Sequence, residues 1–181
     1  MPHINPDNLP SPASFKHRID LQMRFSDVDV LGHVNNTVYF SYYDTGKAYY
    51  LETISGGKVS WQSVEFVLAN VDCAFMVPIY FGEEIEILTK CEYVGEKSLH
   101  LLQMLYSKRD KVVKSINRSV MVSIDPEAKT SRPVPDRWRD GIARYEGTPG
   151  YQGAIPPSTE QDSEHIVHFN NPGVTIESDK R

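Results

Sequence analysis

The sequence predicts an α+β fold in which one long helix packs against a five-stranded, mostly antiparallel sheet. One segment, roughly 37–53, is too long and too continuously apolar to be a strand. One alternating strand-like segment precedes it and four follow it, and short turn signals separate the later ones. Strands that follow one another through hairpins form an antiparallel sheet, and a single helix covers one of its faces.

Length and composition are those of an ordinary globular protein. The chain has 181 residues, of which 40% are hydrophobic and 24% charged, so we expect one domain with extensions. A net charge of −5 argues against a nucleic-acid partner, which would favour a basic face. The two cysteines, Cys73 and Cys91, are too few for a disulfide framework. Both lie within strand-like runs, so we expect buried thiols in a reducing compartment.

The first residues lack the apolar core of a signal peptide, and no apolar stretch approaches the ~18 residues that span a membrane. We therefore expect a cytoplasmic protein without a membrane partner. Residues 1–14 contain four prolines and predict an irregular arm. The domain is expected over residues 15–146. A polar, proline-rich tail follows over residues 147–181, with one short apolar run, 165–169, that can dock on the domain.

In chain order, the first predicted strand covers 18–25, where every second residue is apolar. Asn35 or Asn36 suits the N-cap of the helix, and Gly56-Gly57 ends it. Gly46, in mid-helix, costs about 1 kcal/mol relative to alanine, which predicts close packing of another backbone there. A narrow polar stripe along the helix is formed by Ser41, Asp44, Lys47 or Ala48, and Glu52.

The remaining strands follow from alternation and turns. The apolar positions change phase between 64–68 and 71–75, which predicts a β-bulge near Ala69-Asn70. Residues 85–93 alternate cleanly, whereas 99–106 are apolar on both faces and predict a central strand. The last strand, 112–124, is expected to point three side chains inward: Val120, Val122 and Ile124.

The loop between the first strand and the helix holds two acids, a glycine, a histidine and two asparagines. A carboxylate beside the free N–H groups of a helix start can stabilise a developing oxyanion. Asp29 is the first candidate, because a carboxylate can act as a nucleophile or as a general base on water. The alternative is that Asp27 and Asp29 only bond the local backbone, as aspartates in turns often do.

The same loop resembles a family signature, in the run Asp29-x-x-Gly32-His33-Val34-Asn35-Asn36-x-x-Tyr39. This run is similar to that of hotdog-fold thioesterases of the 4-hydroxybenzoyl-CoA thioesterase type, including the long-chain acyl-CoA thioesterases. Its His-Val-Asn-Asn segment also resembles that of plant acyl-ACP thioesterases. With turns at Pro78, 81–83 and 133–135, the resemblance covers about 15–146. It implies a hotdog fold, in which the long helix lies in the curl of the sheet.

The resemblance implies a catalytic role for Asp29 and an oxyanion donor at the backbone N–H of Asn36. His33 stands where the plant enzymes have a catalytic histidine, but Leu31 replaces their asparagine. His33 is therefore expected to orient water, to contact substrate, or only to pack the loop. No metal and no redox cofactor is implied. The residues expected to contact the substrate are Gly32, Asn35 and Tyr39.

These observations predict a thioester hydrolase that converts acyl-CoA, or acyl-ACP, and water into a carboxylic acid and a thiol. The resemblance also implies a homodimer or a tetramer of dimers, in which the strand over 64–76 completes the partner's site. Lys97 and Arg118 are candidates for contacts with the CoA phosphates. Two alternatives stay open: a hotdog dehydratase acting on hydroxyacyl thioesters, and a non-catalytic module that binds acyl thioesters.

Overall fold

The computed structural model describes residues 4, 8–57, 59 and 65–147. The predicted C-terminal tail, apart from Gly147, lies outside these residues. Two α-helices and five β-strands form the domain, with two 3-10 turns before α1. In chain order the elements are η2 (Pro12–Ser14), β1 (His17–Asp20), η3 (Phe25–Asp27), α1 (Asn36–Ser55), β2 (Phe66–Phe75), β3 (Ile85–Val94), β4 (Ser98–Ser107), β5 (Val113–Ser123) and α2 (Asp136–Glu146).

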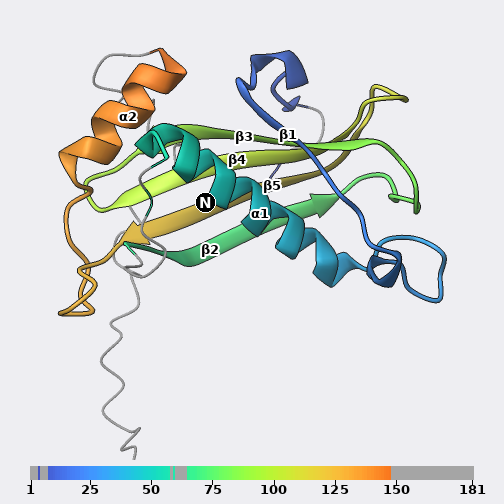
Figure 1. Ribbon diagram of the computed structural model, residues 1–181, viewed down its shortest axis with the longest axis horizontal. Coiled ribbons are helices and arrows are strands. Elements are labelled where there is room, and N and C mark those ends of the chain that lie inside the picture. The colour runs from blue at the N-terminus through green and yellow to red at the C-terminus, as the bar shows by residue number, and fades with distance from the viewer. Residues whose placement is uncertain (1–3, 5–7, 58, 60–64, 148–181) are drawn as a thin grey trace, which may run out of the picture.

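The five strands form one sheet in the order β1-β3-β4-β5-β2, and α1 crosses one face of it (Figure 1). All four strand pairs are antiparallel, which confirms the predicted α+β class. β4 is the central strand, as its two-sided apolar pattern predicts. The predicted bulge is confirmed by a register shift between Leu68 and Asn70 in β2.

Helix α1 begins and ends as the sequence predicts. The side chain of Asn35 accepts a hydrogen bond from the Thr37 backbone N–H at 2.9 Å, so Asn35 is the N-cap. Gly56, with φ of 68°, ends the helix in the left-handed conformation. Tyr43 and Tyr50 point into the core beneath the helix, where both are fully buried. Among the described residues, no helix combines the length and apolar character that crossing a membrane requires.

The first strand is shorter than predicted. β1 ends at Asp20, although the Leu21 N–H still bonds the Ile85 carbonyl at 2.9 Å. The alternation is broken at Phe25, which starts η3 and is 82% exposed. The carboxylate of Asp27 accepts the Arg24 N–H at 2.8 Å, so a local turn replaces the end of the predicted strand.

The predicted inward face of β5 is only partly confirmed, because Val122 is buried but Val120 and Ile124 are half-buried, and none of the three lies beneath α1 in β5. Met121 belongs to the core cluster beneath α1, and strand side chains alternate, so Val120 and Val122 point to the opposite face. Ile124 lies beyond the strand, in an isolated bridge to Ser131. The α1 face of β5 carries mostly polar residues, of which Ser115 and the Asn117 amide have buried hydrogen-bond partners, whereas the Ser119 and Ser123 hydroxyls have none in the described part of the chain. Ser115, for example, is hydrogen-bonded to the Tyr43 hydroxyl.

The polar stripe on α1 is partly confirmed. Ser41, Asp44 and Glu52 are exposed, but Lys47 is only 4% exposed. The Lys47 ammonium lies 2.7 Å from the Asp44 carboxylate, and this pairing at the surface offsets the burial of the rest of the side chain. Tyr49, which lies outside this stripe, is also half exposed.

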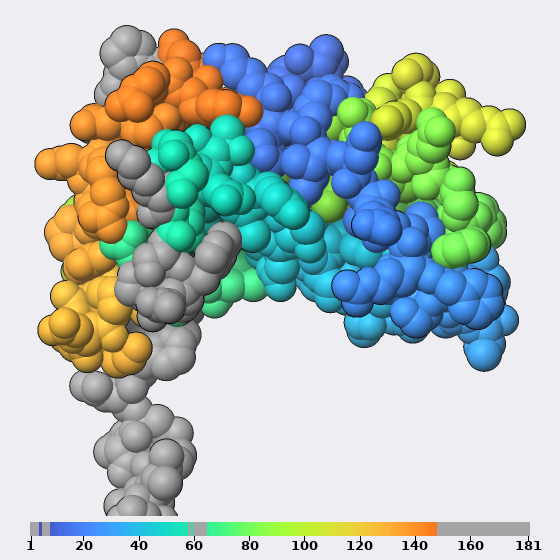
Figure 2. Space-filling view, in the orientation of Figure 1, coloured from blue at the N-terminus to red at the C-terminus, as the bar shows by residue number. Residues whose placement is uncertain are grey.

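Helix α2 is not predicted by the sequence analysis. It packs on the end of α1, where the backbone of Gly141 lies against Ile54. Its sequence does carry a helical signal, because Trp138 and Ile142 are four residues apart and both buried, and Gly147 ends the helix with φ of 89°. The helix and the loop that precedes α1 lie at opposite ends of the face in Figure 2, the helix in orange and the loop in blue.

Phe15 and the described residues of the N-terminal arm pack on the face of the sheet opposite α1. Phe15 is buried there among Leu88, Leu102 and Met104. Ile4 and Leu9 add partly buried apolar contacts to this cluster. Both faces of the central strands are therefore covered within the described part of the chain.

Gly46 sets how closely α1 approaches the sheet. A Cβ at this position would lie 2.6 Å from Ile87 Cγ2 and 2.8 Å from Gln103 Nε2. The neighbours are side chains of β3 and β4, not another backbone as predicted. Gly46→Ala should therefore destabilise the protein by about 1–3 kcal/mol through overpacking, despite the helix propensity of alanine.

Urea unfolding measures this change. Thr45→Ala is the control, because Thr45 is the exposed neighbour on the same helix. It should leave the free energy of unfolding within about 0.5 kcal/mol of wild type. A Gly46→Ala protein as stable as the control would show that α1 can move away from the sheet at no cost.

Candidate active site

The candidate site lies in a tight loop that starts and ends in a short antiparallel bridge between Val28 and Val34. Within it, the Gly32 N–H bonds the Asp29 carbonyl at 3.0 Å, and the Asp29 N–H bonds the His33 carbonyl at 3.1 Å. Gly32 has φ of +82°, as its place in a turn predicts. A Cβ there would meet nothing within 4 Å, so backbone conformation and not space requires the glycine.

Asp29 is half-buried at the start of this loop. Its Oδ1 accepts the Leu31 N–H at 2.8 Å, which is the local turn bond that the alternative interpretation expects. Its Oδ2 has a longer contact of 3.3 Å with the Asn35 side-chain amide. One oxygen thus orients the carboxylate, while the other is only weakly bonded and is available to an incoming group.

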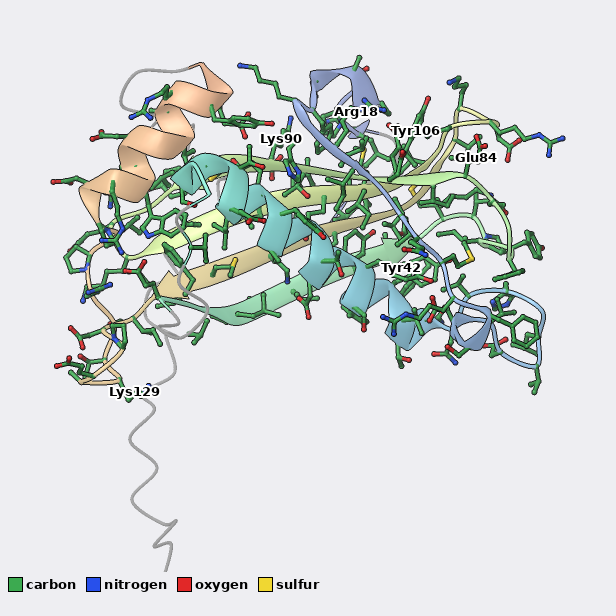
Figure 3. The ribbon with its side chains drawn as sticks, in the orientation of Figure 1. Arg18, Tyr42, Glu84, Lys90, Tyr106 and Lys129 are labelled. Carbon is green, nitrogen blue, oxygen red and sulfur yellow. The ribbon has the colours of Figure 1, made fainter. Side chains whose placement is uncertain are left out.

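Asp27 has a different role, because its carboxylate fastens the loop to α1. Asp27 Oδ2 accepts the Tyr42 hydroxyl at 2.7 Å as well as the Arg24 N–H. Burial, and then the bond to Asp27, raise the pKa of Tyr42 well above its usual value, so the phenol keeps its proton and donates. Tyr42, labelled in Figure 3, reaches from α1 toward the 3-10 turn.

Asn35 and Asn36 lie at the start of α1. Asn35 caps the helix and contacts Asp29, and its own N–H bonds the Asp27 carbonyl at 2.9 Å. Asn36 is the first helical residue, so its N–H has no intrahelical acceptor and lies at the positive end of the helix dipole. The Asn36 side chain is exposed. An oxyanion donor needs a backbone N–H that is free and lies at the start of a helix, as that of Asn36 does. The role of Asn36 as the oxyanion donor stays a prediction.

His33 is half-buried, and its Nδ1 lies 3.3 Å from the Val34 carbonyl oxygen. Because that oxygen can only accept, Nδ1 is the donor in this contact. No hydrogen bond between the His33 ring and Asp29 is present in the described part of the chain. His33 thus packs in the loop, and its contact with water or substrate stays a prediction.

Tyr39 is set apart from the other candidates. It is buried against Val34 and Ile79, and its ring lies edge-on to Phe75 with 5.1 Å between the centroids. Burial raises the pKa of its phenol. The structure therefore brings together Asp29, Gly32, His33, Asn35 and Asn36, and places Tyr39 beneath them as a core residue.

Sequence reasoning missed the turn that supports this loop. The Val34 N–H bonds the Ile79 carbonyl at 2.8 Å, and both side chains are fully buried. Pro78 and Gly82 mark a turn in the sequence. Nothing in their spacing indicates that the backbone of this turn, which follows α1, bonds to the loop that precedes α1.

The two candidate CoA-phosphate contacts lie away from Asp29. Arg118 points to the face opposite α1, where its Nε lies 3.0 Å from a Glu92 carboxylate oxygen. Lys97 lies in the hairpin between β3 and β4, next to Glu96, whose carbonyl accepts from Arg139 of α2. That hairpin is at the opposite end of the sheet from the Asp29 loop (Figure 1).

The bond between Tyr42 and Asp27 can be tested by Tyr42→Phe. Removing the hydroxyl takes a charge-assisted hydrogen bond from a partly buried carboxylate, so we expect a loss of about 1.5–3 kcal/mol in the free energy of unfolding. Urea unfolding measures it, with Tyr49→Phe as the matched control on the exposed side of the same helix. Equal stabilities of the two variants would mean that this bond does not hold the loop.

The comparisons with known proteins agree with this geometry. A family model described as "Thioesterase-like superfamily" matches residues 23–142, which include the whole candidate site. The chain is also 30% identical over 89 residues to the uncharacterized protein YsmA of Bacillus subtilis. That match spans 49% of this chain and 60% of the length of YsmA.

Solved structures share the fold. A thioesterase of Thermus thermophilus, crystallised with coenzyme A and Zn, is 27% identical with a TM-score of 0.68, over 75% of this chain and 98% of that chain. A Staphylococcus aureus protein solved in complex with CoA is 16% identical with a TM-score of 0.66, over 77% and 95% of the two chains, and shows the fold alone. The sheet and α1 have the arrangement of these structures, so the chain has the hotdog fold. Because the family model matches most of the described domain, the chain belongs to the thioesterase-like superfamily.

Proposed function

We propose that this protein hydrolyses acyl-CoA thioesters to a free carboxylic acid and CoA, with acyl-ACP as the alternative substrate. One observation carries the proposal. The Asp29 carboxylate lies in the loop directly before α1, the N–H of Asn36 lies at the start of α1, and the side chain of Asn35 contacts Asp29 and caps the helix. The match to a thioesterase crystallised with coenzyme A supports CoA as the carrier.

The chemistry needs two functions at one carbonyl. The Asn36 N–H, at the positive end of α1, would receive the thioester oxygen and stabilise the negative charge that develops on it. Asp29 would attack the carbonyl carbon, form a mixed anhydride and expel the thiolate, after which water would release the acid. Alternatively, Asp29 would take a proton from a water molecule that attacks directly.

The hydrogen bonds of the two aspartates support Asp29 as the reacting group. Asp27 Oδ2 is engaged by the Tyr42 hydroxyl and the Arg24 N–H, and both bonds would have to break before that oxygen could react. Asp29 Oδ2 has only the 3.3 Å amide contact with Asn35. The oxygen of Asp29 that is freer is also in contact with the side chain of Asn35, the N-cap of α1.

Asp29→Asn tests the mechanism. Asparagine keeps an oxygen that can accept the Leu31 N–H but removes the charge, so the loop should stay folded. We expect kcat/KM to fall at least ~100-fold, a loss of about 3 kcal/mol of transition-state stabilisation. Thiol release from short, medium, long and aromatic acyl-CoAs measures it and identifies the acyl class.

The matched control is Asn36→Ala, which removes a side chain but keeps the backbone donor and should change kcat less than about tenfold. Turnover that survives in Asp29→Asn would contradict the assignment and make His33 the next candidate. Binding of acyl-CoA without turnover by the wild-type protein would favour the non-catalytic module.

We further propose that two copies of the chain form the active unit. β2 is an edge strand, and no other strand in the described part of the chain pairs with its outer side. On the α1 side, Leu68 is 47% and Phe75 45% exposed, and the Phe75 ring lies 6.4 Å from that of Phe40. This apolar edge and the family resemblance support a pairing of the two sheets through β2.

Light scattering should therefore give at least twice the 20.6 kDa mass of the chain. Leu68→Lys should shift the protein toward the monomer, since a charge would be buried in the pair. Thr45→Lys, on the exposed side of α1, is the control. A fully active wild-type monomer would contradict a site shared between two copies.

A further inference from the structure

The loop that carries Asp29 is attached to the sheet through the turn between β2 and β3. The only backbone hydrogen bond that joins this turn to the 28–34 bridge, in the described part of the chain, runs from the Val34 N–H to the Ile79 carbonyl. Val34 also forms the bridge with Val28, the residue before Asp29. The Ile79 carbonyl, together with the attachment of Asp27 to α1, therefore sets where both ends of the loop lie.

A nearly buried ion pair holds this turn on both sides of Ile79. The Lys114 ammonium lies 2.7 Å from Glu83 Oε2, and it donates to the Pro78 carbonyl at 3.0 Å. The other oxygen of Glu83 accepts the Tyr80 N–H at 2.9 Å. Ile79 thus lies between two backbone groups that the pair fixes directly.

Lys114 is itself fixed in the sheet. It belongs to β5, and its carbonyl accepts the N–H groups of Met76 and Val77 at 2.9 and 3.0 Å. Its side chain is only 5% exposed and that of Glu83 is 18% exposed. The turn is therefore attached to the sheet by the backbone and by the side chain of one residue.

The fold alone does not require a charged pair at this position. Taking two charges out of water is costly, and apolar side chains of similar volume often stabilise a protein as well or better. Unlike apolar side chains, an ion pair with directed hydrogen bonds fixes the backbone groups that it bonds in one defined geometry. In this protein that geometry fixes the turn that positions Val34.

We propose that Lys114 and Glu83 are positioning residues for Asp29. By holding the Ile79 carbonyl in place, they set the position of the Asp29 carboxylate relative to the N–H of Asn36. The inference rests on the proposed function, because it takes Asp29 as the reacting group. Neither Lys114 nor Glu83 has a contact with Asp29 among those described, so both act through the turn.

The test uses Lys114→Met, Glu83→Gln and the double variant Lys114→Met/Glu83→Met. Since a small displacement of a reacting group can cost up to ~100-fold, we expect kcat for CoA-thioester hydrolysis to fall about 10- to 100-fold in each single variant. KM should change less than about twofold. Amide hydrogen exchange at Val34 and Asn35 should become at least ~10-fold faster, because both N–H groups belong to the positioned loop.

The double variant separates positioning from stability. An apolar pair leaves no unpaired buried charge but still loses the bonds to the Pro78 carbonyl and the Tyr80 N–H, so the thermal midpoint should rise above those of the single variants. The reduced kcat and the faster exchange at Val34 should remain. A double variant with wild-type kcat and wild-type exchange would overturn the proposal.

Glu86→Gln is the matched control. Glu86 is 18% exposed, as Glu83 is, and pairs with Arg18 at 2.6 Å, but it lies in β3 and has no contact with Lys114 or Ile79 among those described. It should lower the thermal midpoint without changing kcat or the exchange at Val34. If Lys114→Met behaves in the same way, the pair is merely structural. If the wild-type protein hydrolyses no thioester, the proposed function fails, while faster exchange at Val34 would still support positioning of the loop.

Discussion

The contact of Gly46 with the sheet is the constraint on which the rest of the site depends. It lets α1 lie directly on Ile87, Thr89 and Gln103, close enough for the Gln103 amide to donate to the Tyr43 carbonyl at 2.9 Å. With the middle of the helix fixed, its first turn has a fixed place at the end of the sheet. The proposed oxyanion donor would have to be preorganised, and the attachment of the helix to the sheet would supply that preorganisation.

The loop before the helix is held from two sides. Asp27 connects it to α1 through Tyr42, and Ile79 connects it to the sheet through Val34. Asp29 lies between these attachments with its Oδ2 weakly bonded. The two aspartates, two residues apart, thus differ in their hydrogen bonding. The Asp27 carboxylate holds the loop on α1, whereas one oxygen of Asp29 stays weakly bonded.

Much of the fold is predictable because its signals are local. The N-cap at Asn35, the end of α1 at Gly56 and the bulge in β2 each depend on neighbouring residues. The predicted strand fails at Phe25 because a local turn interrupts the alternation. On β5, Ser115 and Asn117 lie beneath the helix with hydrogen bonds to Tyr43 and Gln103, so Val120 and Val122 point to the opposite face.

The sequence by itself determined the element order, the long buried helix and the grouping of Asp29, Gly32, His33, Asn35 and Asn36 in one loop. These residues are adjacent in the chain, and capping and turn geometry act over a few residues. Only the tertiary structure decided that Tyr39 is a core residue, that Arg118 faces away from Asp29, and that Lys114 and Glu83 support the loop. Those relations join residues far apart in sequence, and they depend on the register of the strands and the approach of α1, which no local pattern encodes.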